Sequence, residues 1–362
     1  MIVIGTDTHK RTHTAAAANS ATGELMGNLT APARTPGFTA LLDWAMALDA
    51  ERIWAIEDCR HVSASFERHL VACGERVVRV PPKLMGQSRK GERTAGKSDE
   101  IDAIAIARAP IEQGPGTLPA AHLDQRALQV KLLLDHREDL VRARSEDQQR
   151  LRWHLHRLWP GYEIPVGALD RIVWLEKTAR KLARAEQSTR VAIARELVVE
   201  IKRRTRRAAE LERQIASLVD DYAPQLLELP GCGSLTAAKI IAEVAGAKRF
   251  SSDAKLARLA GVAPIPASSG KTSRHRLDRG GNRQLNCAFH RIAVTQGRVH
   301  PPAREFLARK QAEGKGRMEA LRCLKRHLVR AVWNALRASE SFDTDSRKLQ
   351  ATPTPAIAAG LT

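Results

Sequence analysis

The chain has 362 residues, which is enough for two or three domains with apolar cores. Its 59 Lys and Arg residues outnumber 40 Asp and Glu residues, and the net charge of +19 predicts a polyanionic partner, nucleic acid ahead of a membrane. The absence of a bilayer-length apolar run and of a signal-peptide layout predicts a cytoplasmic protein. The cysteines form no CxxC pair, which argues against a zinc site or a disulfide framework and predicts reduced, mostly buried thiols. They are Cys59, Cys73, Cys232, Cys287 and Cys323.

The first hundred residues alternate between strand-like and helix-like patterns. The expected strands are Ile2–Ile4, Thr12–Ala18, Leu25–Leu29, Arg52–Ile56 and Val77–Val80. Helices are expected from Thr35, over His61–Cys73 and from Asp99, with a basic, Gly-rich loop over 83–96. The order β-β-β-α-β-α-β-loop-α is that of a ribonuclease-H-like fold.

Acidic residues stand at the ends of these elements. Asp7 and Glu57 each follow a short strand, and Asp99 and Asp102 share one face of the last helix. If the strands lie in one sheet beside that helix, the four carboxylates converge, and their repulsion favours a bound cation. This predicts an all-oxygen Mg²⁺ site. The alternative is that Asp99 is an N-cap with Asp102 as its partner, and that the other acids lie on the surface.

The middle of the chain is helical and rich in arginine. A linker is expected over 111–123, followed by a long helix over Asp124–Leu158 and a break at Pro160-Gly161. A second long helix is expected over Val173–Val219. These segments are either two solvated helices packed as a hairpin or a coiled coil that dimerises or follows a nucleic-acid backbone, and we favour a mixture.

The C-terminal third contains two glycine-rich segments. Gly231-Cys232-Gly233 leads into a helix over 235–245 and resembles a helix-hairpin-helix element, whose backbone amides approach phosphate, although a plain helix turn also favours glycine. Ser268-Ser269-Gly270-Lys271 opens a basic stretch that, taken alone, is typical of a flexible loop. Further helices are expected over 254–259, 282–295, 302–312 and 318–338, before a Ser-, Thr-, Pro- and Ala-rich tail.

Together these residues resemble the DEDD transposases of the insertion-sequence one-ten family, which includes the Piv-type DNA invertases. "VIGTDTHK" is similar to the family's first strand with its catalytic Asp, "AIEDCR" to the position of its Glu, and "KSDEIDA" to its paired acids. "LARLAGVAPIPASSGK" and "RGGNRQLN" are similar to the C-terminal transposase domain. The chain departs from the family at Asp58-Cys59-Arg60, where Ala-Thr-Gly usually follows the Glu. Asp58 can be mistaken for the ligand, and Arg60 can alter strand access.

The resemblance implies an α/β domain plus all-α regions. The expected domains are a RuvC-like catalytic domain over 1–115, a linker and coiled coil over 116–222, a C-terminal transposase domain with a helix-hairpin-helix element over 223–340, and a disordered tail over 341–362. It implies Mg²⁺-dependent recombination through a covalent 5′-phosphoserine link at Ser269, with Ser268 as the lesser candidate. It also implies a guiding bridge RNA, donor and target DNA, and a dimer or tetramer in which the serine of one subunit completes another's acidic site.

The expected site therefore has three parts. Asp7, Glu57, Asp99 and Asp102 hold the metal, and Ser269 is the nucleophile. The expected nucleic-acid-binding residues are Lys97, Gly231, Gly233, Lys271, Arg274, Arg276, Arg279 and Arg283, whose guanidinium groups can form forked hydrogen bonds to phosphate. Two rival hypotheses are a RuvC-like Holliday-junction nuclease that uses water and a non-catalytic nucleic-acid-binding scaffold.

Overall fold

The computed structural model describes residues 1–57, 60–81, 84, 98–118, 120–121, 124–267, 275–276, 278 and 280–350. The chain divides into two compact units. The first comprises Met1–Asp124, Ala245–Asn286 and Met318–Arg337, and the second comprises Gln125–Val244, Cys287–Arg317 and Ala338–Thr362. Each unit is assembled from several segments of the chain, and the expected domain boundaries after residues 115 and 222 stay a prediction.

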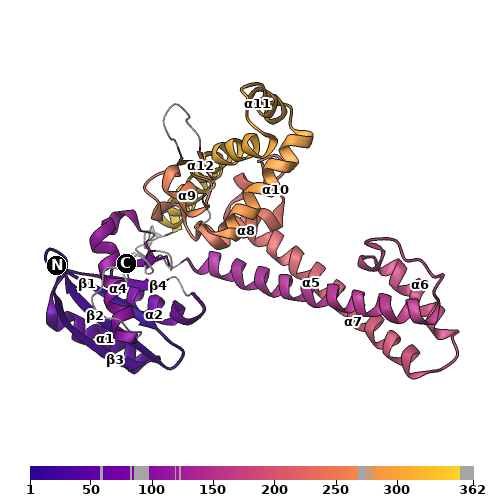
Figure 1. The fold of residues 1–362 in the computed structure, drawn as a ribbon, viewed down its shortest axis with the longest axis horizontal. Helices are drawn as coiled ribbons and strands as arrows, with labels where there is room; N and C mark the ends of the chain where they lie inside the picture. The colour runs from indigo at the N-terminus through magenta and orange to yellow at the C-terminus, as the bar shows by residue number, and fades with distance from the viewer. Residues whose placement is uncertain are drawn as a thin grey trace, which may run out of the picture. The chain divides into compact units, whose positions relative to one another are not determined.

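A five-stranded mixed sheet forms the N-terminal part of the first unit (Figure 1). Its strands are β1 (Ile2–Thr8), β2 (Thr12–Asn19), β3 (Leu25–Pro32), β4 (Arg52–Glu57) and β5 (Val77–Val80). In the order β3-β2-β1-β4-β5, the first three strands of the chain form an antiparallel meander, and β1, β4 and β5 run parallel. The predicted mixed α/β class of this region is confirmed.

Helices cover both faces of this sheet. They are α1 (Thr35–Leu48), α2 (Arg60–Ala72) and α4 (Asp99–Gln113). Ile4 and Trp54 pack against Phe38 of α1 and Phe66 of α2 on one face, whereas Ile106 of α4 packs on the other. Because successive side chains of a strand point to opposite faces, β1 is buried along its whole length.

The expected linker over 111–123 begins as helix. α4 continues through Pro110 to Gln113, and Ile111 packs beside the cluster that α4 forms with the sheet. Burial of this last turn against apolar side chains therefore outweighs the helix-breaking tendency of proline. A short 3₁₀ turn, η2 (Pro115–Thr117), follows.

Long helices dominate the second unit (Figure 1). They are α5 (Gln125–Leu158), α6 (Ile172–Ala183), α7 (Thr189–Tyr222) and α8 (Ser234–Val244), with the 3₁₀ turns η3 (Ala168–Asp170) and η4 (Pro224–Leu226). α7 packs along α5, and α8 contacts both. The single helix expected over 173–219 is instead two helices, because Ser188 caps α7 by accepting a hydrogen bond from the amide of Val191 (3.3 Å).

Short elements and further helices make up the rest of the described chain. They are η5 (Ala247–Arg249), α9 (Asp253–Leu259), β6 (Ile265–Pro266), β7 (His275–Arg276), α10 (Arg283–Val299), α11 (Pro301–Ala312) and α12 (Arg317–Gln350). β6 and β7 pair antiparallel, with Ile265 opposite Arg276. No helix of the described part of the chain has the length and apolar character needed to cross a bilayer.

Two further expectations differ from this structure. α12 continues to Gln350, into the tail over 341–362 that was expected to be disordered, and no proline interrupts it up to that residue. The thiols are not mostly buried: among the described cysteines, Cys232 alone is buried, whereas Cys73 and Cys287 are exposed.

Candidate acidic metal centre

Two acidic side chains lie at the carboxyl ends of neighbouring strands of the sheet. β1 and β4 are parallel neighbours with Thr6 opposite Ile56, so Asp7 and Glu57 follow side by side at the carboxyl ends of their strands. Ala55, two residues before Glu57, packs on the face that α4 covers. Because side chains two residues apart share a face, Glu57 is directed to the α4 side of the sheet. The same alternation places Asp7 on that side.

Gly5 brings α4 against this part of β1. A Cβ atom at Gly5 would overlap the carbonyl oxygen of Ala103 and the amide nitrogen of Ala107, both in the backbone of α4. Only glycine permits two backbones to approach this closely. The missing side chain therefore lets the first turns of α4 lie over the end of β1, two residues before Asp7.

The first turn of α4 supplies the other two acids. The Ser98 hydroxyl caps the helix by accepting a hydrogen bond from the amide of Ile101 (3.2 Å). The alternative in which Asp99 is the N-cap is therefore wrong, and its carboxylate is not used for capping. Asp102 is only 6% exposed, whereas Asp99 is exposed. We call Asp7, Glu57, Asp99 and Asp102 the acidic cluster.

The electrostatics of Asp7 show that these four acids interact. Asp7 is 5% exposed, and burial raises the pKa of its carboxyl group. His9 acts in the opposite direction, but the charges of Asp102, Asp99 and Glu57 each raise the pKa of Asp7 further. The carboxylates are therefore close enough to act on one another, and a bound cation would offset their repulsion.

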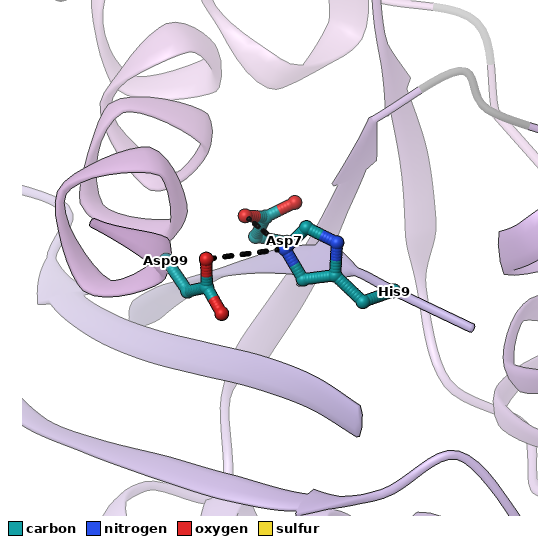
Figure 2. Close-up of side chains that lie close together, drawn as sticks. All are labelled: Asp7, His9 and Asp99. Carbon is teal, nitrogen blue, oxygen red and sulfur yellow. Dashed lines mark hydrogen bonds and ion pairs between the residues drawn. The ribbon is translucent and has the colours of Figure 1, made fainter. Parts of the chain in front are cut away.

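His9 is a member of this site that sequence reasoning missed. Its Nε2 lies 3.1 Å from Oδ2 of Asp7 and 3.2 Å from Oδ1 of Asp99, so it bridges the strand acid and the helix acid (Figure 2). Its only signal in the sequence was its position two residues after Asp7. The contact of His9 with Asp99 depends on where α4 begins, which its local sequence does not reveal.

The donor set of the site fits a divalent ion. Asp7, His9 and Asp99 each offer one ligand atom, and these atoms lie within 4.8 Å of one another. Asp102 and Glu57 add carboxylate oxygens whose charges act on Asp7. Carboxylate oxygens are the ligands that Mg²⁺ and Mn²⁺ accept. Coordination by two or more of these groups would also offset their mutual repulsion.

The other predicted site residues are described only in part. Arg276 in β7 and Arg283 at the start of α10 are exposed. Gly231 has φ +82°, and Gly233 has open space around it just before α8. The remaining predicted residues lie outside the described residues: Asp58, Cys59, Lys97, Ser268, Ser269, Lys271, Arg274 and Arg279. Of Arg60, only the backbone is described.

Comparisons with known proteins found matches in the N-terminal and C-terminal parts of the chain. Residues 4–160 match the DEDD domain of IS110 transposases, and residues 223–308 match the family described as "Transposase IS116/IS110/IS902 family". The uncharacterized 44.8 kDa protein of insertion element IS116 from Streptomyces clavuligerus is 25% identical over 80% of this chain and 83% of its own length.

Two further relatives also match over most of their own length. The uncharacterized 42 kDa protein of insertion element IS900 from Mycobacterium paratuberculosis is 26% identical over 81% of this chain and 84% of its own length. The transposase for insertion sequence element IS1328 from Yersinia enterocolitica is 26% identical over 72% of this chain and 74% of its own length. The acidic cluster lies within the matched N-terminal region.

Proposed function

Because this chain belongs to the IS116/IS110/IS902 family of insertion-sequence transposases, we propose that its acidic cluster and a distant serine together cut and rejoin DNA strands. The observation that carries the proposal is the position of the four acids. Asp7 and Glu57 end neighbouring parallel strands, and α4 lies over the same face. Carboxylates gathered in this way are suited to hold divalent ions beside a scissile phosphate.

Mg²⁺ is the ion we propose for this reaction. Asp7, Glu57, Asp99 and Asp102 would hold it, since carboxylate oxygens satisfy its octahedral preference. When bound, one or two such ions, about 4 Å apart if two, would neutralise charge that develops on the phosphoryl and leaving oxygens. The raised pKa of Asp7 supports this assignment, because a bound cation offsets the burial of its carboxylate as well as the repulsion from Asp102, Asp99 and Glu57.

We assign the nucleophile to Ser269. Its Oγ attacks the phosphorus of the scissile phosphodiester, a bond forms between Oγ and phosphorus, and the bond to the 3′ oxygen breaks. The hydroxyl proton passes to the departing 3′ oxygen, which leaves a 5′-phosphoserine and a free 3′ hydroxyl. Attack by the 3′ hydroxyl of a second strand reverses these steps and releases the serine. The bond energy is thus kept, and the strands can be exchanged without another energy source.

Basic residues of the C-terminal region would hold the nucleic acids. Exposed Arg276 and Arg283 both follow the serine-bearing segment in the sequence, and arginine can pair with phosphate through two hydrogen bonds. We extend this role to Lys97, Lys271, Arg274 and Arg279, and to the backbone amides that follow Gly231 and Gly233. We further propose that the protein acts on donor and target DNA and that a bridge RNA guides it. We also propose that it works as a dimer or tetramer in which one subunit supplies the serine to another's acidic cluster.

A covalent-trapping experiment tests the proposal. The protein is incubated with Mg²⁺, donor and target DNA and RNA transcribed from the DNA that flanks its gene, and the mixture is analysed on a denaturing gel. We expect a protein–DNA adduct that Ser269→Ala abolishes, whereas Ser268→Ala retains it. Asp102→Asn should abolish both the adduct and strand cleavage. RNA binding should persist in all three variants.

Each rival hypothesis predicts a different result in this experiment. Metal-dependent cleavage without an adduct would identify a nuclease that uses water, and an adduct that forms in Ser269→Ala would refute the serine assignment. Nucleic-acid binding without any metal-dependent cleavage would identify a non-catalytic scaffold. Full cleavage in Asp102→Asn would remove the metal hypothesis.

A further inference from the structure

His9 joins two elements of the acidic cluster through a single ring nitrogen. Its Nε2 lies 3.1 Å from an oxygen of Asp7, at the end of β1, and 3.2 Å from an oxygen of Asp99, in the first turn of α4 (Figure 2). The imidazole side chain is 49% exposed, so it is not held there by apolar packing. It occupies this position because two carboxylates direct their oxygens at the same nitrogen.

These hydrogen-bond spacings also match the distances between neighbouring ligands of one metal ion. With bonds of about 2.1 Å, neighbouring ligands in an octahedral shell lie about 3 Å apart. The distances from Nε2 to both carboxylate oxygens are close to that value, and the three atoms lie within 4.8 Å of one another. One ion could therefore contact all three atoms after small side-chain adjustments.

We infer that His9 is a nitrogen ligand of the divalent ion at the acidic cluster, and that it therefore contributes more to the binding of a transition metal such as Mn²⁺ than to that of Mg²⁺. Mg²⁺ favours all-oxygen shells, whereas a divalent transition metal also accepts imidazole nitrogen. The ring would coordinate as the neutral tautomer that carries its proton on Nδ1. This inference rests on the metal site of the proposed function and adds a ligand to it.

Electron spin echo envelope modulation of bound Mn²⁺ tests the assignment directly. The full-length protein is purified without a polyhistidine tag and mixed with less than one equivalent of Mn²⁺. A coordinated imidazole produces ¹⁴N modulation, which carboxylates and water do not produce. We expect this modulation in the unaltered protein and its loss in His9→Gln. His156→Gln, which changes an exposed histidine of α5, is the matched control and should retain it.

Affinity measurements by calorimetry provide a second readout. Loss of residues that merely support a metal ligand costs about 10–100-fold in affinity, so His9→Gln should weaken Mn²⁺ binding by at least about tenfold. Mg²⁺ affinity should change far less, because water replaces the missing ligand readily in its shell. The ratio of the two affinities should therefore fall in His9→Gln and stay unchanged in His156→Gln.

The outcomes separate this inference from the proposed function. If Mn²⁺ binds and Asp7→Asn abolishes binding, but the unaltered protein shows no ¹⁴N modulation, the role of His9 is refuted and the carboxylate site stands. Modulation that persists in His9→Gln also refutes the inference. If Mn²⁺ does not bind, or binds equally to Asp7→Asn, both the nitrogen ligand and the proposed metal site are overturned.

Discussion

Asp7 is held where its negative charge is unfavourable to the fold without a cation. Burial raises the pKa of its carboxyl group, and the charges of Asp102, Asp99 and Glu57 raise it further against the opposing effect of His9. A carboxyl group whose pKa is higher in the folded state binds its proton more tightly there. Its contribution to stability is therefore present at low pH and is lost as the pH rises through the folded-state pKa.

Asp7→Asn should therefore stabilise the metal-free protein at neutral pH. Each kcal/mol of repulsion that is removed should raise the melting temperature by about 1–2 °C, because the entropy of unfolding of a 362-residue chain is large. The gain should shrink in acid, where Asp7 is protonated, and added Mg²⁺ should raise the melting temperature of the unaltered protein but not of this variant. Differential scanning calorimetry at several pH values measures both effects.

Asp49→Asn is the control, because the pKa of Asp49 is lowered whereas that of Asp7 is raised. Hydrogen bonds from the backbone amide of Glu51 and from the chain's amino group lower the pKa of Asp49. Removing that charge should give no gain in melting temperature at neutral pH. A melting temperature that falls in metal-free Asp7→Asn would show that the Asp7 carboxylate stabilises the fold, contrary to the repulsion argued here.

At the scale of elements, the site depends on how closely α4 approaches β1. Gly5 has no side chain where the backbone of α4 passes, and Ala103 and Ala107 supply the backbone atoms that a Cβ would meet. Both alanines are fully buried, so neither can move aside without moving the helix. The position of Asp99 and Asp102 relative to Asp7 thus depends on a residue that carries no functional group.

Gly5→Ala should impair the site through this contact. The added methyl group forces α4 away from β1, and overpacking of this kind costs about 1–3 kcal/mol or more of unfolding free energy. Urea unfolding should show the loss, and the trapped DNA adduct should decrease more than stability alone explains. Gly116→Ala, where a Cβ meets open space, should leave both measurements unchanged. Equal adduct yield in Gly5→Ala would contradict the positional argument.

The order of strands and helices in the N-terminal region, and the positions of the four acids within it, could be predicted from local sequence patterns. Strand-ending acids at Asp7 and Glu57 and the three-residue spacing of Asp99 and Asp102 are visible in the sequence, because strand and helix periods determine which residues share a face. The role of His9 was not predictable, since its second contact depends on where α4 packs. The break before Ser188 was missed because apolar periodicity continues on both sides of it.

At the scale of the whole molecule, the positive charge is unevenly compensated. The net charge is +19, yet arginines of the long helices often face acids on the same helix, as Arg203 faces Glu200 (2.8 Å) and Arg142 faces Asp139 (3.2 Å). Among the described residues, exposed Arg276 of β7 and Arg283 of α10 form no ion pair with an acid. Charge that is already paired releases fewer counterions on binding, so these arginines should contribute more to nucleic-acid affinity.

Salt dependence measures that contribution. Binding to a duplex of DNA should weaken steeply with salt, by about 10³–10⁵ between 50 and 200 mM if the protein makes 6–10 phosphate contacts. Arg276→Ala and Arg283→Ala should each reduce the slope of log affinity against log salt by about 0.9, since each removes one phosphate contact. Arg203→Ala, which removes an arginine already paired with Glu200, should leave the slope nearly unchanged. Fluorescence anisotropy across a salt series gives all three slopes, and equal slopes in the β7 and α10 variants and the unaltered protein would exclude these residues from the DNA interface.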